Sequence, residues 1–270
     1  ALRTFRHYPG RRALRALFSA ACPQEAPRGP KDLQAVATAC EDAVELGLES
    51  LRSSEALLLT RISGEDTGVP SEALAKLAWC AAATAPDRLR VPVLKACEKL
   101  RTSDLKPTEL NPDILAQLFE CAALVAVHEA NMDAESLLGA SLFRDAKRAF
   151  HIRESRRFNN VSTTHLEVRD CLVRLGEEVC SQIQDASGNC LDFTLGIPST
   201  DRPLAICIEP TSETYANCTR MCQKSTKIRR QLIGIEGWIL VTISEIEWRQ
   251  LGTLPEKINA LKSSLETTNR

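Results

Sequence analysis

The stretch TKIRRQLIGIEGWILVTISEIEW (residues 226–248) joins a basic segment, a glycine-bounded turn and a short apolar run. Ile228, Leu232 and Ile233 of the basic segment recur at the spacing of one helix face. The run WILVTIS (238–244) has the length and the β-branched content of a buried strand. The stretch therefore predicts a helix that packs on a sheet, followed by an inner strand of that sheet.

The basic residues of this helix predict a second, charged face in addition to the apolar face that packs on the sheet. The cations are Lys224, Lys227, Arg229 and Arg230. We expect them to contact RNA phosphates, because each phosphate that Lys or Arg neutralises releases counterions. Aromatic residues make up only 4% of the chain, which favours recognition of phosphates and shape over stacking on bases. In the alternative interpretation, the cations pair with Glu236, Glu245 and Glu247.

The sequence around this stretch predicts a mixed α/β unit. Residues 164–176 have a helical pattern that ends at a glycine. Three strand-like runs follow, separated by turn-type sequences: VCSQIQ (179–184), CLDFTLG (190–196) and LAICIEP (204–210). Residues 218–234 are then predicted to form one helix, and residues 254–266 a final helix. Helix, three strands, helix, strand and helix make a compact domain that combines a sheet with helices.

The N-terminal half has helical periodicity over residues 31–46, 71–84, 92–101 and 112–129. Two of its segments are alike: LAKLAWCAAA (74–83) and LAQLFECAAL (115–124) share six of ten residues at an offset of 41, and 33–42 is a weaker third copy. A period near 40 in helical segments is typical of α-solenoids. The alternative is an ordinary bundle with two similar alanine-rich helices.

The chain contains eleven cysteines, an odd number without the tight spacing of a secreted disulfide framework. Several lie among Ala and Leu at helical positions, where a reduced Cys behaves as a small apolar residue. Cys218 and Cys222 are expected one helical turn apart, without the second pair that a zinc site needs. We therefore expect a reducing compartment and no bound metal.

Charge is unevenly distributed along the chain, although the total is only −1. Residues 1–31 carry seven Lys or Arg and one acid, 32–150 carry twelve and nineteen, and 151–270 carry fifteen of each. The first segment also has the Arg-, Ala- and Leu-rich composition of an organellar transit peptide. We expect this basic arm to bind a polyanion through Arg3, Arg6, Arg11, Arg12 and Arg15. The alternative is an arm that folds back on the acidic middle of the chain.

A second basic run, RDAKRAFHIRESRR (144–157), joins the helical half to the mixed half. Such a run is commonly a solvated helix face. Its last two cations, Arg156 and Arg157, are nevertheless candidates for contacts with RNA, because they adjoin the next domain.

The C-terminal segment, roughly residues 160–266, resembles a RAP domain. The resemblance rests on an ordered set of motifs: Leu175-Gly176, Asp192-Phe193, Ile208-Glu209, Thr226-Lys227, Arg229, Leu232, Gly237-Trp238 and Glu247-Trp248. RAP domains occur at the carboxyl end of organellar RNA-binding proteins, often behind octotricopeptide- or heptatricopeptide-like helical repeats. The chain departs from the family at Pro210-Thr211, where an acidic, glycine-containing turn is usual.

The resemblance also implies a restriction-endonuclease-like fold, and this raises the question of nuclease activity. Such a site needs two carboxylates on adjacent strands to hold a divalent cation, with a lysine close by. Asp192 and Glu209 fall on successive predicted strands, but Thr211 stands where the lysine is expected, so that Lys224 or Lys227 would have to replace it. Alternatively, both carboxylates are structural and pair with Arg229 or Arg230.

The sequence as a whole predicts an α+β protein in three parts: a basic extension (1–31), a solenoid-like α-helical repeat (32–155) and an endonuclease-like RAP domain (160–270). We expect a non-catalytic RNA-binding protein without a cofactor, in the mitochondrial matrix. Its expected partners are rRNA and, through the repeats, other subunits of the mitochondrial ribosome; no apolar run has the length to span a membrane. The alternatives are a metal-dependent RNA endonuclease or processing factor and a protein-interaction scaffold.

Overall fold

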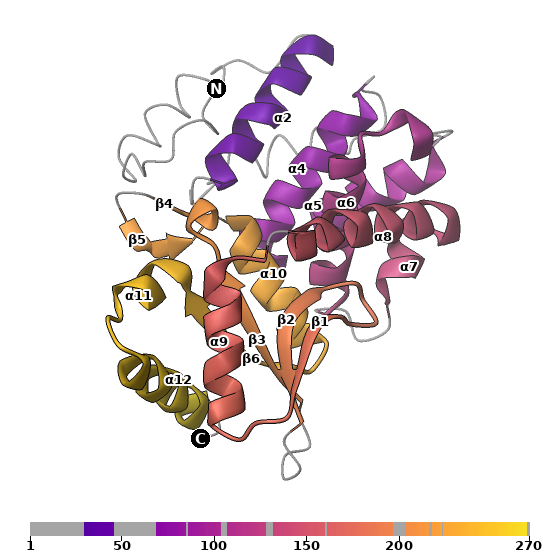
Figure 1. Cartoon of the computed structure of the whole chain (residues 1–270). Coiled ribbons are helices and arrows are strands. Elements are labelled where there is room, and N and C mark those ends of the chain that lie inside the picture. The colour runs from indigo at the N-terminus through magenta and orange to yellow at the C-terminus, as the bar shows by residue number, and fades with distance from the viewer. Residues whose placement is uncertain are drawn as a thin grey trace. The chain divides into compact units, whose positions relative to one another are not determined.

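The structure is a computed structural model in two compact units (Figure 1). It describes residues 30–45, 69–84, 86–103, 107–127, 132–159, 161–196, 203–215, 218–222 and 224–268. The first unit comprises residues 1–150 with 223–228, and the second comprises 151–222 with 229–270. The protein is α+β: helices make up the described part of the first unit, apart from connecting segments, and the second unit contains a sheet.

The first unit is a set of packed helices. They are α2 (Pro30–Glu45), α4 (Ser71–Thr84), α5 (Pro86–Thr102), η2 (Pro107–Glu109), α6 (Pro112–Ala126), α7 (Ala134–Leu138) and the first part of α8 (Ala140–Ser155). Helix α4 packs against α2, α5 and α6 and is buried from Ala73 to Ala83 except at Lys76. A helix that is apolar on all sides belongs in a core, and its alanines allow neighbouring helices to approach closely.

Buried polar groups connect these helices in pairs. Trp79 Nε1 of α4 donates a hydrogen bond to Glu120 Oε2 of α6 at 2.8 Å. Glu41 of α2 accepts a hydrogen bond from Gln117 of α6 at 2.7 Å and forms an ion pair with Lys76 of α4 at 3.1 Å. A buried carboxylate is tolerated only with such partners, so these contacts fix which helices lie side by side.

The four cysteines of the helical half are reduced and buried, as their positions among Ala and Leu predict. Cys40, Cys80, Cys97 and Cys121 lie in α2, α4, α5 and α6 and are at most 2% exposed. They fill the space between helices as small apolar side chains. None of the described helices combines the length and the apolar character that crossing a membrane requires.

The second unit is built on a mixed sheet, here called the main sheet. Its strands are β1 (Val179–Gln184), β2 (Cys190–Leu195), β3 (Leu204–Glu209) and β6 (Ile239–Ser244), in the order β1-β2-β3-β6. The first three strands are antiparallel neighbours, and β6 runs parallel to β3. A separate small sheet pairs β4 (Thr214–Tyr215) with β5 (Cys218–Cys222).

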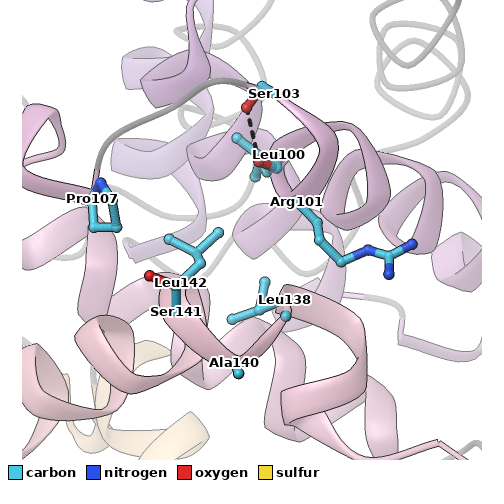
Figure 2. Close-up of a pocket in the computed structure, with 9 residues that line it drawn as sticks. Leu100, Arg101, Ser103, Pro107, Leu138, Ala140, Ser141 and Leu142 are labelled. Carbon is cyan, nitrogen blue, oxygen red and sulfur yellow. Dashed lines mark hydrogen bonds between the residues drawn. The ribbon is translucent and has the colours of Figure 1, made fainter.

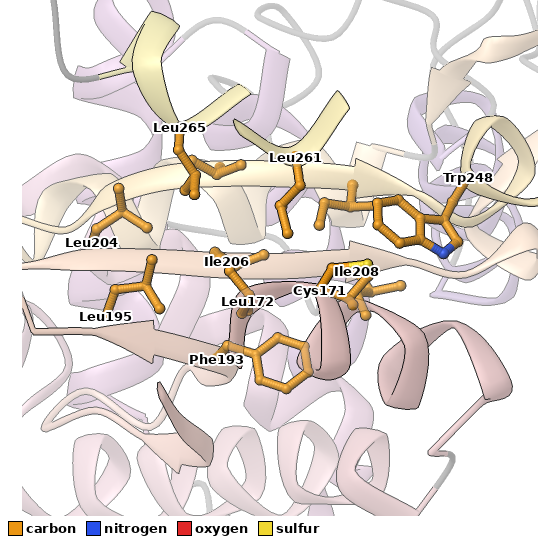
Figure 3. Packing of buried hydrophobic residues seen from close by; sticks show 13 residues of the cluster. Cys171, Leu172, Phe193, Leu195, Leu204, Ile206, Ile208, Trp248, Leu261 and Leu265 are labelled. Carbon is orange, nitrogen blue, oxygen red and sulfur yellow. The ribbon is translucent and has the colours of Figure 1, made fainter. Parts of the chain in front are cut away.

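Helices cover both faces of the main sheet. On one face lie α9 (Thr163–Arg174), α11 (Glu245–Gln250) and α12 (Leu254–Thr268), and on the other lies the later part of α10 (Lys224–Ile235). Residues Leu204, Ile206 and Ile208 of β3 point to the first face, where they meet Leu172, Leu261 and Trp248 (Figure 3). Ala205 and Cys207 point to the second face, beside Ile233 of α10. This two-sided burial explains why all residues of β2 and β3 are buried and why β3 is apolar from Leu204 to Ile208.

Two predictions about the stretch 218–244 are wrong. Residues 218–222 form strand β5 and pair with β4, so Cys218 and Cys222 do not lie one helical turn apart; helix α10 begins only at Lys224. The sequence predicts residues 238–244 to be an inner strand. In the described residues, β6 lies instead at the edge of the main sheet, and β3 is the inner strand beside β2. Helix α10 also passes Gly234 and ends before Gly237, whose φ of 86° suits the residue that follows a helix.

Candidate functional site

A pocket of about 230 Å³ lies in the second unit at the carboxyl end of β3. Its lining residues are Arg157, His165, Asp192, Ile208, Pro210, Ser212 and Glu213. They come from η3 (Arg156–Asn159), the first turn of α9, β2, the end of β3 and η4 (Thr211–Glu213). Cationic, anionic, hydroxyl and apolar groups thus meet in one hollow.

The ring of His165 is held in one tautomer. Its Nδ1 accepts a hydrogen bond from the backbone N–H of Ser162 at 3.1 Å, and the Ser162 hydroxyl lies 2.9 Å from the same nitrogen. A backbone N–H can only donate, so the proton of a neutral ring is on Nε2. Nε2 therefore donates to Asp192 Oδ1 at 3.3 Å. Ser162 precedes α9, so a helix cap orients this ring in the pocket.

Asp192 is fixed through both of its oxygens. In addition to the contact with His165, Oδ2 accepts a hydrogen bond from the backbone N–H of Ile208 at 2.7 Å. The register of β2 and β3 runs from Leu195↔Leu204 to Phe193↔Ile206, so the carboxylate bonds the neighbouring strand just beyond the paired residues. Asp192 therefore holds α9 and β3 together at the wall of the pocket.

An ion pair connects the two short helices at the pocket. Arg157 of η3 binds Glu213 of η4, and both side chains are partly exposed. Behind η4, the backbone N–H and the hydroxyl of Thr211 donate to Glu245 Oε2 at 3.0 and 3.1 Å. Burial acts to raise the pKa of Glu245, but the hydrogen bonds from Thr211 outweigh it and the pKa lies below its ordinary value. Glu245 is thus a charged anchor for the turn that carries Glu213.

The cations of α10 do not form the exposed face that the sequence predicts. Arg229 is only 4% exposed; its Nε lies 3.0 Å from Glu154 Oε2, and its Nη2 donates to the carbonyl of Cys190. Burial acts to lower the pKa of Arg229, but neighbouring acidic groups, Cys207 and Glu154 first, raise it above its ordinary value. The expectation that Arg229 faces RNA is therefore wrong, because this guanidinium is an internal ion-pair partner.

Arg230 is more exposed than Arg229 but is also paired. It binds Glu209, whose side chain is nearly buried. Glu154 is thus an acidic partner of Arg229, and Glu209 is an acidic partner of Arg230.

The two candidate nuclease carboxylates lie on adjacent strands, but they do not converge. Asp192 contacts His165 on the α9 side, whereas Glu209 alternates with Ile208 along β3 and pairs with Arg230 of α10. Within the described ranges, no cluster of three or more His, Cys, Asp or Glu residues is arranged to hold a metal ion. The candidate lysines, Lys224 and Lys227, belong to the first unit, and Thr211 binds Glu245.

The remaining predicted RNA contacts fall into two groups. In the described part, Arg156 is exposed on η3, Arg157 lines the pocket, and Lys224 and Lys227 are half-buried in the first turn of α10. The others, Arg3, Arg6, Arg11, Arg12 and Arg15, lie outside the described residues. Sequence reasoning missed His165, Ser212 and Glu213, and no local pattern in the sequence marked them as members of one site.

A second pocket, of about 250 Å³, lies in the first unit (Figure 2). Leu100, Leu138 and Leu142 supply apolar walls, and the guanidinium of Arg101 extends away from them. The Ser103 hydroxyl donates to the carbonyl of Leu100 at 2.8 Å and so is used within the wall itself. This pocket brings no acid and base together, and the pocket beside His165 is the better candidate site.

No model of a known protein family matches the chain, and no curated protein matches it either. The fold and the site define a class only coarsely: an α+β protein with packed helices before a mixed α/β unit, which has a small polar pocket at the end of its central strand.

Proposed function

We propose that the protein is a non-catalytic RNA-binding protein of a mitochondrial ribonucleoprotein, most simply the ribosome. The observation that carries this proposal is the placement of Arg156 and Arg157 in η3. Arg156 is exposed to solvent, and Arg157, the next residue, lines the pocket with its donor and acceptor groups. A cation for the phosphate backbone thus lies beside groups that can read a base.

The C-terminal unit supports a RAP-like, restriction-endonuclease-like domain. Its mixed sheet has helices on both faces, and Asp192 and Glu209 lie on adjacent strands of that sheet. The partners of these carboxylates favour binding over cleavage: Asp192 is committed to His165 and Ile208, and Glu209 to Arg230. The residues that would form a cation site in a nuclease stabilise the domain instead.

The helices of the first unit support a solenoid-like repeat. The two similar segments are parts of α4 and α6, which pack against one another, and α4 also packs against α2, which contains the third copy. The hydrogen bond from Trp79 to Glu120 joins residues at the repeat offset of 41. Stacking of equivalent helices is how a solenoid builds its core. We assign the surface of these helices to protein partners, since residues 32–150 carry an excess of acids.

The mitochondrial location and the rRNA partner rest on the composition of residues 1–31 and on the resemblance to RAP proteins. Seven cations and one acid in this segment favour a polyanionic partner.

The proposal is tested with the full chain and a labelled, short single-stranded RNA in a fluorescence anisotropy titration at several salt concentrations. Arg156→Gln should weaken binding and reduce the salt slope by about 0.7, the value for one phosphate neutralised on a single strand. Arg169→Gln is the matched control, because Arg169 is an exposed arginine on α9 that is not among the residues lining the pocket.

Two results would contradict the proposal. Equal losses of affinity in both variants would mean that the RNA responds only to net charge. Magnesium-dependent shortening of the RNA during the titration, abolished by Asp192→Asn, would show that the protein cleaves RNA.

A further inference from the structure

The pocket beside His165 offers both kinds of hydrogen-bonding group between apolar walls. Ile208 and Pro210 provide the apolar surface. The Arg157 guanidinium carries five N–H donors and no acceptor, and the ionised Glu213 carboxylate is an acceptor only. Because the two side chains form an ion pair, a donor group and an acceptor group lie next to one another at the pocket.

Charge decides between a phosphate and a base as the occupant. Among the lining residues, one guanidinium stands beside two carboxylates, Asp192 and Glu213. His165 adds no positive charge in its neutral form, in which Nδ1 accepts from Ser162 and Nε2 donates to Asp192. A phosphate would enter a hollow with an excess of negative charge. A neutral ring with N–H groups on its edge suits these acceptors.

Size favours a single ring system. The pocket measures about 230 Å³. Pockets for drug-sized ligands typically span about 300–1,000 Å³, so this one is small even for a nucleotide with its sugar and phosphate. A base that is turned out of its strand can enter such a pocket between apolar side chains and be read along its Watson–Crick edge.

Guanine has the edge that matches this pair. It presents the acceptor O6 next to the donors N1–H and N2–H₂, so that a guanidinium can bind O6 while a neighbouring carboxylate accepts from both nitrogens. Adenine, cytosine and uracil lack two adjacent donors beside an acceptor. We therefore propose that the pocket binds one guanine base, with Arg157 donating to O6 and Glu213 accepting from N1–H and N2–H₂. This proposal names the base that the RNA-binding protein proposed above would select, and it rests on that proposed function because the guanine would belong to the bound RNA.

The frame of the pocket is fixed before any base enters. Both oxygens of Asp192 are engaged, by His165 and by the backbone of Ile208, so Asp192 shapes the wall and does not read the base. Thr211 anchors η4, and with it the turn that bears Glu213, to Glu245 of α11. A preformed site loses little conformational entropy on binding, which favours recognition of one base by few contacts.

The experiment uses the full chain with two probes. The first is a set of uridine-rich RNA oligonucleotides that differ at one central position, which is guanine, inosine or adenine. The second is free guanosine, with adenosine as its control, followed by ligand-observed NMR. Wild-type protein should bind the guanine oligonucleotide at least about tenfold more tightly than the adenine one, with inosine between them because it lacks the N2 amine.

Variants assign the preference to the pocket. Glu213→Gln should remove the preference for guanine, whereas Glu178→Gln, which neutralises an exposed carboxylate of the same unit, should keep it. If circular dichroism shows that Glu213→Gln fails to fold, Arg157→Lys takes its place: it keeps the charge but loses the planar fork, and should also reduce the preference.

Each failure has its own signature. Tight RNA binding without base preference, and no guanosine signal, would overturn the guanine pocket and leave RNA binding intact. A guanosine signal that Glu213→Gln abolishes, without binding of any RNA, would retain the pocket for free guanine compounds and overturn the proposed function. Absence of both signals would overturn both.

Discussion

At the scale of single residues, Arg229 shows how a buried charge is accommodated. Its guanidinium lies among Glu154, the carbonyl of Cys190 and the thiol of Cys207, and it is almost inaccessible to solvent. A charge in this position is tolerated only because it is paired and hydrogen-bonded. The pair Arg229–Glu154 joins α10 to the last turn of α8 within the second unit.

Removal of this pair should destabilise the protein strongly. Arg229→Gln leaves the Glu154 carboxylate buried without its cation, and such changes cost about 3–5 kcal/mol. The exposed arginine Arg169 is the control, and Arg169→Gln should change the free energy of unfolding by about 0.5 kcal/mol or less. Urea denaturation measures both. If Arg229→Gln were as mild as Arg169→Gln, Arg229 would be solvated and the assignment of an internal ion pair would be wrong.

The sequence could not reveal this burial. Arg229 follows Ile228 on a helix whose apolar face is clear, and a cation beside that face is usually solvated. Its partner Glu154 is 75 residues away in the chain, where nothing local marks it. The same holds for His165 and Glu213 in the pocket: each has an ordinary local role, in a helix cap or a turn, and only the tertiary fold brings them together.

At the scale of the elements, sequence patterns predict the helices and strands whose formation depends on neighbouring residues in the chain. The strands β1, β2 and β3 follow from short runs bounded by turn-type sequences, β6 follows from its β-branched apolar content, and the apolar face of α10 follows from its helical spacing. The sequence predicts residues 218–222 as the start of a helix because the hydrogen bonds that β5 receives from β4 are not visible in any local pattern. The position of β6 at the edge likewise depends on which strand pairs with which.

Helix α10 provides a matched test of its two faces. Ile233 is 0% exposed and packs against Leu191, Ala205 and Cys207, whereas Ile235 on the same helix is 40% exposed. Ile233→Ala should cost about 2–5 kcal/mol of unfolding free energy, because apolar burial is removed and a cavity remains. Ile235→Ala should cost far less, and urea denaturation of both variants measures the difference. Equal destabilisation would mean that α10 does not pack on the main sheet through the face described.

At the scale of the whole molecule, charge is distributed unevenly among three segments of the sequence. Residues 1–31 are strongly basic, residues 32–150 are acidic, and residues 151–270 are balanced. In the balanced segment, several charges are paired internally, as Arg229–Glu154, Arg230–Glu209 and Arg157–Glu213 show. Most of the electrostatic attraction for RNA should therefore come from the arm, with the pocket supplying selectivity.

The arm can be tested by its salt dependence, although it lies outside the described residues. Replacing Arg3, Arg6, Arg11, Arg12 and Arg15 with Gln should weaken RNA binding and lower the salt slope by about 0.7 for each phosphate that the arm no longer neutralises. Replacing the same five with Lys should keep the slope, because counterion release depends on charge and not on guanidinium geometry. Anisotropy titrations over a salt series measure both variants. An unchanged slope in the Gln variant would mean that the arm docks on protein, and the acidic residues of the helical unit would then be its partner.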